Sequence, residues 1–292
     1  MSLQWVDAVC INQKDDAEKS HQVQQMKDIY HTAIGTAVWL GKHADASEVA
    51  FKNISALNEK YHEPIQVADW GPILSEVNVE NEEDEVLNPE AMSALLKRPW
   101  FTRVWILQEI SVAKGVVFLC GDAIVTDRAM NVAMKMFIYL QSIIAHDPDR
   151  RTEYQSRFVK KLTIRAEKVA SRLPSSIQGK STTLWQLMDR IYPTSIPGDF
   201  TSRATDPRDL VYALLGIASD AEELGIEIDY SKSVQEVFTN TAVAILCTGR
   251  IEVLAHAQHP QLTLGLPSWV PDVSSTSLTY YSADIIISGD LT

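Results

Sequence analysis

The sequence is short of cysteine, of long apolar runs and of segments that direct a chain into the secretory pathway, and each shortage excludes a class of protein. Its three cysteines, Cys10, Cys120 and Cys247, are widely spaced and form no C-x-x-C pair, which favours free thiols in a reducing compartment. No uncharged apolar run approaches the roughly 20 residues that a membrane-spanning helix requires. The first five residues lack the basic and apolar regions of a secretory signal. These features favour the cytosol or the nucleus, and we expect a cytoplasmic protein without a membrane span.

Positive charge is also scarce. The 292 residues include 26 Lys or Arg and 38 Asp or Glu, which gives a net charge of −12. Because nucleic-acid binding requires clustered positive charge, we do not expect a nucleic-acid partner. One basic stretch, Arg150–Arg172, predicts an amphipathic helix whose basic face is either solvated or bound to an acidic partner.

The first sixty residues alternate between predicted strands and helices. Residues 3–9 and 36–40 are short apolar runs typical of buried strands. Asp15 and Asp45 are each followed three residues later by Glu, which predicts a capped helix start after each of these runs. Strand, helix, strand, helix is the α/β pattern, and it predicts a parallel sheet flanked by helices.

The remainder of the chain is predicted to be mostly helical. An acidic segment over 59–90 interrupts the pattern as a long loop, and the Gly121-Asp122 turn between two apolar runs predicts a hairpin over 116–126. We therefore expect an α/β domain over 1–126 and a helical region over 127–292 that packs on it or follows it. Helices are expected over 89–97, 103–110, 128–145, 152–173, 183–192, 209–215 and 234–248.

Common catalytic and metal-binding motifs are missing from the sequence. It contains no G-x-S-x-G, H-E-x-x-H or G-x-G-x-x-G pattern. His256 and His259 have the spacing of a metal-binding pair, but no further ligand completes a site. We therefore expect no metal and no bound cofactor.

One pair of residues suggests chemistry. Trp105 and Glu109 lie four apart in a predicted helix, so their side chains share a face. A carboxylate beside an indole can bind sugar hydroxyls and stabilise an oxocarbenium-like charge, as the cleavage of a glycosidic bond to nicotinamide requires. The alternative is a helix buried by its tryptophans, in which Glu109 forms a salt bridge with Arg98 or Arg103.

Several segments together resemble the fungal heterokaryon-incompatibility (HET) domain. The first is W-V-D-A-V-C-I-N-Q at 5–13, and the second is R-P-W-F-T-R-V-W-I-L-Q-E at 98–109. D-P-R-D-L-V-Y-A-L-L-G at 206–216 resembles a third block, and residues 229–231 and 266–272 resemble later ones. The blocks extend over nearly the whole chain, and in combination they are highly specific.

The resemblance implies a function and a fold. HET-domain proteins act in fungal nonself recognition, where incompatible fusion triggers programmed cell death. The domain resembles the Toll/interleukin-1-receptor (TIR) fold, a flavodoxin-like parallel sheet, and some TIR domains hydrolyse NAD with a glutamate in a W-x-x-x-E helix. By this analogy NAD is a candidate substrate and Glu109 the candidate catalytic carboxylate. The non-enzymatic alternative is a module that acts by self-association or by binding an incompatibility partner.

The same analogy predicts a cleft at the carboxyl ends of the strands. HET domains usually begin with a strand and a Tyr-x-Trp-Gly type motif, and this chain starts at the block after it, so we expect the first strand to be missing. The direction of the Glu109 carboxylate, into a cavity or towards an arginine, separates the enzymatic from the structural reading. The candidate substrate-binding residues are Trp105, Asp7, Asn12, Gln13, Trp39, Trp100 and Arg103.

Overall fold

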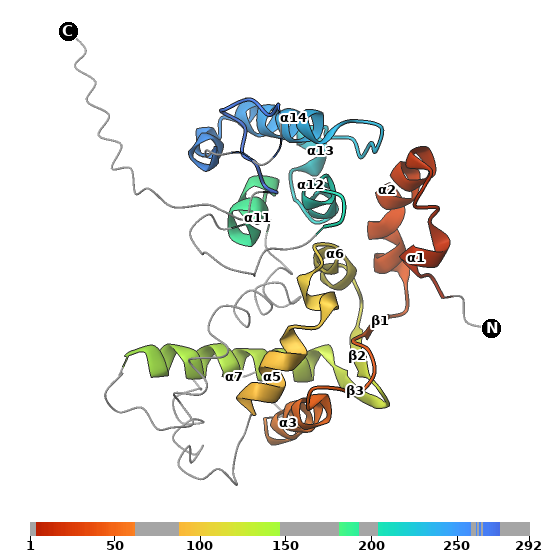
Figure 1. The fold of residues 1–292 in the computed structure, drawn as a ribbon, viewed down its shortest axis with the longest axis vertical. Coiled ribbons are helices and arrows are strands. Elements are labelled where there is room, and N and C mark those ends of the chain that lie inside the picture. The colour runs from red at the N-terminus through yellow and green to blue at the C-terminus, as the bar shows by residue number, and fades with distance from the viewer. Residues whose placement is uncertain are drawn as a thin grey trace.

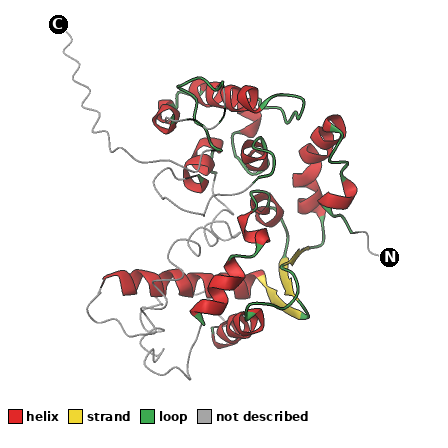
Figure 2. Cartoon of the chain, in the orientation of Figure 1, coloured by secondary structure: helices red, strands yellow, loops and turns green. Residues whose placement is uncertain are grey.

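The computed structural model describes residues 4–61, 88–146, 181–192, 204–257, 261, 263 and 265–274 (Figure 1). Most of the acidic segment, the predicted helix over 152–173 and His259 lie outside the described residues. Within the described part, helices surround one small sheet (Figure 2). None of the described helices has the length and apolar character needed to cross a membrane.

The sheet has three described strands in the order β1-β2-β3. β1 (Thr36–Trp39) pairs in parallel with β2 (Val116–Cys120), and β2 pairs antiparallel with β3 (Ala123–Thr126). The sheet is therefore mixed, and the predicted hairpin is confirmed. Gly121 closes it with φ +58°, a conformation that costs glycine little.

Alternation along the strands gives the sheet one covered face and one open face. Val38, Phe118 and Val125 are buried beneath α3 (Ser47–Lys60) and α7 (Asp127–His146), which contact β2 or β3. On the opposite face Trp39 and Ile124 are exposed. A period of two residues in each strand produces this division.

The expectation of a strand over 3–9 was wrong. Asp7–Cys10 is a single helical turn, α1, in which the amides of Val9 and Cys10 both donate to the carbonyl of Val6. Val6, Val9 and Cys10 are exposed, so the apolar run has no buried face that would hold it in a sheet. Short apolar runs do not distinguish a strand from a helix by periodicity, and the local turn prevails here.

Of the two helix caps predicted in the first sixty residues, the one at Asp15 is confirmed and the one at Asp45 is not. α2 (Asp16–Thr32) is capped by Asp15, whose carboxylate accepts from the amides of Ala17 and Glu18 at 3.0 Å each. α3 begins instead after Ala46, which has no side-chain cap, so the predicted Asp45 cap was wrong. Both Asp45 and Ala46 have positive φ, a geometry that turns the chain sharply into α3.

The second HET-like block forms two short helical pieces, and the helix expected over 103–110 begins three residues later than predicted. Pro99–Thr102 is a 3₁₀ turn (η3), and α6 (Ile106–Ser111) begins after Trp105. α6 contacts α2 on one side and α12 (Asp209–Leu215) on another. Because it lies between these helices, all of its residues from Ile106 to Ile110 are buried.

The helical character of the C-terminal region is confirmed for the described residues. α11 (Leu184–Ile191) and α14 (Val234–Cys247) each begin with a capping box, at Thr183 and Ser233 respectively. Their buried residues belong to the same apolar cluster as those of the sheet. The remaining described helices are α5 (Pro89–Leu96), α13 (Ala221–Leu224) and the 3₁₀ turn η5 (Ile251–His256).

Candidate functional site

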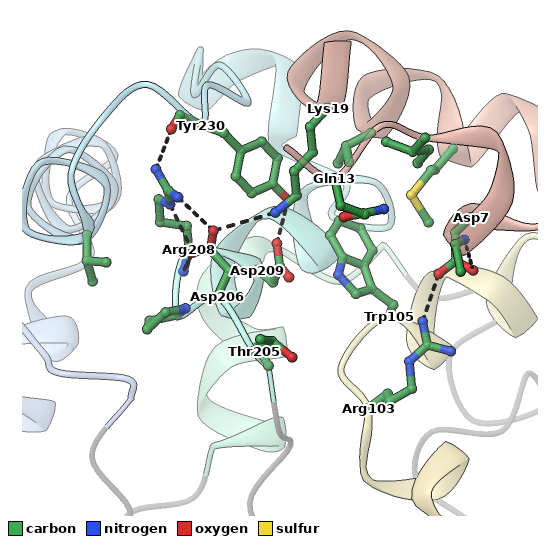
Figure 3. A pocket seen from close by; sticks show the side chains of 17 residues that line it. Asp7, Gln13, Lys19, Arg103, Trp105, Thr205, Asp206, Arg208, Asp209 and Tyr230 are labelled. Atoms are coloured by element: carbon green, nitrogen blue, oxygen red, sulfur yellow. Dashed lines mark hydrogen bonds and ion pairs between the residues drawn. The ribbon is translucent and has the colours of Figure 1, made fainter. Parts of the chain in front are cut away.

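A cavity of about 770 Å³ lies between α1 and α2 on one side and residues 204–234 on the other. Four of the residues predicted from the sequence line it: Asp7, Gln13, Arg103 and Trp105. Figure 3 shows Trp105 between the Asp7–Arg103 pair and a group of side chains from the C-terminal region. The cavity is large enough for a small organic ligand.

The other four predicted residues lie elsewhere. Trp39 is 56% exposed on the open face of the sheet, and Asn12 lies in the exposed loop before α2, where its side chain accepts from the amide of Lys14. Trp100 and Glu109 are buried and are not among the residues that line the cavity. The structure therefore brings together only part of the predicted set.

Glu109 is held from two sides. Its carboxylate accepts from the indole Nε1 of Trp100 at 3.1 Å and lies 3.5 Å from the guanidinium of Arg103, and the residue is 6% exposed. Arg103 also donates to Asp7 at 2.9 Å, so one cation joins the two carboxylates. Burial raises the pKa of Glu109, although the charge of Arg103 and the hydrogen bond from Trp100 oppose the rise. These contacts are the ones expected if Glu109 is a structural residue that forms a salt bridge with Arg103 in a buried helix.

The opposite wall comes from residues that the sequence analysis did not assign to a site. Arg208 donates to both carboxylate oxygens of Asp206, at 2.9 and 2.7 Å, and to the backbone carbonyls of Tyr230 and Lys232. Lys19 of α2 lies 3.5 Å from Asp206 and 3.6 Å from the centre of the Tyr230 ring. The D-P-R-D segment at 206–209 was identified in the sequence as part of a third HET-like block but was not assigned to a site, and that resemblance was the signal that could have revealed Asp206, Arg208 and Asp209.

Asp209 lies at the back of this wall, next to Trp105 (Figure 3). Its carboxylate accepts a hydrogen bond from the phenol of Tyr230. Burial raises the pKa of Asp209, and the hydrogen bond from Tyr230 opposes the rise. Burial and the neighbouring Asp209 also raise the pKa of Tyr230, so the phenol keeps its proton at neutral pH and remains a donor.

Neither wall provides a metal site. Within the described ranges, no three His, Cys, Asp or Glu side chains are arranged to hold a metal ion. His256 is paired instead with Asp189 at 3.2 Å and packs edge-on against Trp185. The chemistry available in the cavity is therefore that of an aromatic surface, carboxyl and amide groups, and ion pairs.

Because the carboxyl group of Glu109 is buried, we expect the free energy of unfolding to fall with rising pH, and we expect Glu109→Gln to reduce this dependence. Between the ordinary pKa of 4.5 and the raised folded value, the folded chain holds more protons than the unfolded chain. The free energy of unfolding contributed by this group therefore falls as pH rises through that window, by at most about 1.4 kcal/mol per pH unit. Glutamine keeps an acceptor for Trp100 and does not titrate.

Urea unfolding at several pH values between about 5 and 8 measures this difference. Glu222→Gln, a change at an exposed position of α13, is the control and should follow the wild type. If Glu109→Gln and the wild type lose stability with the same slope, the carboxylate does not have the raised pKa that its burial implies.

Comparisons with known proteins point to one family. Residues 1–109 match the family described as heterokaryon incompatibility protein (HET). Over an alignment of 309 positions the chain is 28% identical to heterokaryon incompatibility protein 6, OR allele, of Neurospora crassa. The alignment covers 92% of this chain and 44% of that relative, so the chain spans less than half of the relative's length. No solved structure gives a significant match. The HET resemblance is thus confirmed.

Proposed function

Because residues 1–109 are a HET domain, we propose that this protein is an effector module of fungal nonself recognition that promotes programmed cell death. The observation that carries the proposal is the HET match together with relatedness to a heterokaryon incompatibility protein. We propose that it acts in the cytoplasm, by self-association or through an incompatibility partner, and that the cavity beside Trp105 is its functional site.

The finer architecture is part of the same proposal. The parallel pairing of β1 with β2, with helices α3, α5 and α6 in the connection between them, is consistent with a TIR-like arrangement. A division into a domain over 1–126 and a helical region over 127–292 agrees with the end of β3 at Thr126, the last strand among the described residues. The shared apolar cluster and the shared cavity indicate that the two parts act together.

In this proposal Glu109 is a structural group. It holds Trp100 and Arg103 at the junction between η3 and α6, and Arg103 in turn holds Asp7 at the cavity wall. The second candidate function is NAD cleavage, which is favoured by an indole that lines a cavity of sufficient size. That candidate requires Glu109 to leave these partners and reach the cavity.

Inducible expression of the chain in a fungal host tests the proposal. We expect the wild type to cause cell death and Glu109→Gln to do so equally at matched protein levels, because glutamine preserves the hydrogen bond from Trp100. Absence of death with the wild type contradicts the effector role. Loss of death with Glu109→Gln, together with loss of nicotinamide release from NAD by the purified protein, selects the second candidate instead.

A further inference from the structure

We propose that the cavity binds a nucleoside-like ligand, with its planar ring stacked on Trp105 and its hydroxyl groups bonded to Asp209 and Gln13. This inference names a class of ligand for the cavity beside Trp105, and it rests on the proposal that this cavity is the functional site. It differs from the W-x-x-x-E analogy in the carboxyl group that meets the ligand, which is Asp209 from the C-terminal region and not Glu109.

Trp105 provides the stacking surface. Its side chain is partly buried, packs against the apolar core and lines the cavity beside Asp209, and this packing restricts the indole ring. Such a ring offers a flat apolar face without further loss of side-chain freedom when a ligand binds. Flat aromatic rings stack on such faces largely irrespective of their substituents.

The charges of the lining favour a neutral ligand. Three carboxyl residues face three cationic residues, and every one of these cations already has a carboxylate within 3.5 Å. A phosphate or other anion would have to displace one of these carboxylates. A neutral ligand that carries hydroxyl groups leaves the pairs intact. The carboxyl residues are Asp7, Asp206 and Asp209, and the cationic residues are Lys19, Arg103 and Arg208.

Hydrogen-bonding capacity remains next to the stacking surface. Asp209 accepts a hydrogen bond from the phenol of Tyr230, and a carboxylate has about four acceptor positions, so it can also accept from ligand hydroxyls. Gln13 is exposed and lines the cavity, and no described residue hydrogen-bonds its side-chain amide. A planar ring joined to hydroxyl-bearing carbons matches this combination, and nucleosides have that form.

Calorimetric titration of the full chain with adenosine tests the proposal, with D-ribose and inorganic phosphate as comparison ligands. We expect adenosine to bind, ribose to bind much more weakly because it lacks a planar ring, and phosphate to leave adenosine binding unchanged. Asp209→Asn should weaken adenosine binding at least about tenfold, and Gln13→Ala about threefold. Glu222→Gln, away from the cavity, should bind like the wild type.

Three results would overturn the proposal: no adenosine binding by the wild type, displacement of adenosine by phosphate, or wild-type affinity in both cavity variants. Gln13 is exposed, so Gln13→Ala keeps the test valid if Asp209→Asn fails to fold. Because binding and cell death are measured separately, cell death without adenosine binding contradicts the ligand and leaves the effector role standing. Adenosine binding without cell death contradicts the effector role and leaves the ligand proposal standing.

Discussion

Replacing Trp100 by alanine is expected to lower the free energy of unfolding by about 4 kcal/mol. The indole is 8% exposed and packs edge-on against Phe101 and Phe118, with ring centres 5.0 and 5.5 Å away. Its removal opens a cavity beneath the sheet and takes from Glu109 the one hydrogen bond that its Oε2 accepts from a described residue. Both losses act in the same direction, and urea unfolding at neutral pH measures their sum.

Trp39→Ala is the matched control. Trp39 was predicted from the sequence as a site residue together with Trp100, but it is 56% exposed on the open sheet face. We expect its replacement to change the free energy of unfolding by no more than about 0.5 kcal/mol. Equal losses in the two alanine variants would contradict the burial assigned to Trp100.

Replacing Arg208 by alanine is expected to cost about 3 kcal/mol and to loosen the C-terminal wall of the cavity. The guanidinium bonds both oxygens of Asp206 and the carbonyls of Tyr230 and Lys232, so its loss leaves a partly buried carboxylate and two carbonyls without their main donor. The backbone amide of residue 208 and the more distant Lys19 then remain beside the Asp206 carboxylate. Urea unfolding measures the loss, and near-ultraviolet circular dichroism reports the changed environment of Tyr230.

Two further variants separate the effect of geometry from that of charge. Arg208→Lys keeps the positive charge but cannot form the two-pronged bond to Asp206, so it should recover less than half of the lost stability. Arg128→Ala removes an exposed arginine at the start of α7 and should be close to neutral. Full recovery by lysine would show that the hydrogen-bond geometry around Arg208 contributes little.

Local sequence signals predicted much of the fold. The hairpin over 116–126 and the cap at Asp15 depend on neighbouring residues alone, and the structure contains both. The strand expected over 3–9 failed because an apolar run becomes a strand only where partners and a covering layer exist. The seven residues of this run contain no information on those partners.

The site was predicted only in part, for a similar reason. Asp7, Gln13, Arg103 and Trp105 were proposed from two HET-like blocks, and all four line the same cavity. The helix expected over 103–110 placed Glu109 on the same face as Trp105, but α6 begins only after Trp105, and the Glu109 carboxylate contacts Trp100 and Arg103. The opposite wall is about a hundred residues further along the chain, and no local pattern relates it to Trp105.

The most direct test compares cell death in a fungal host for the wild type, Glu109→Gln and Asp209→Asn at matched protein levels. If the cavity is the functional site and Glu109 only supports it, Glu109→Gln retains cell death and Asp209→Asn loses it. The opposite result, loss with Glu109→Gln and retention with Asp209→Asn, would contradict the account and return the catalytic role to Glu109.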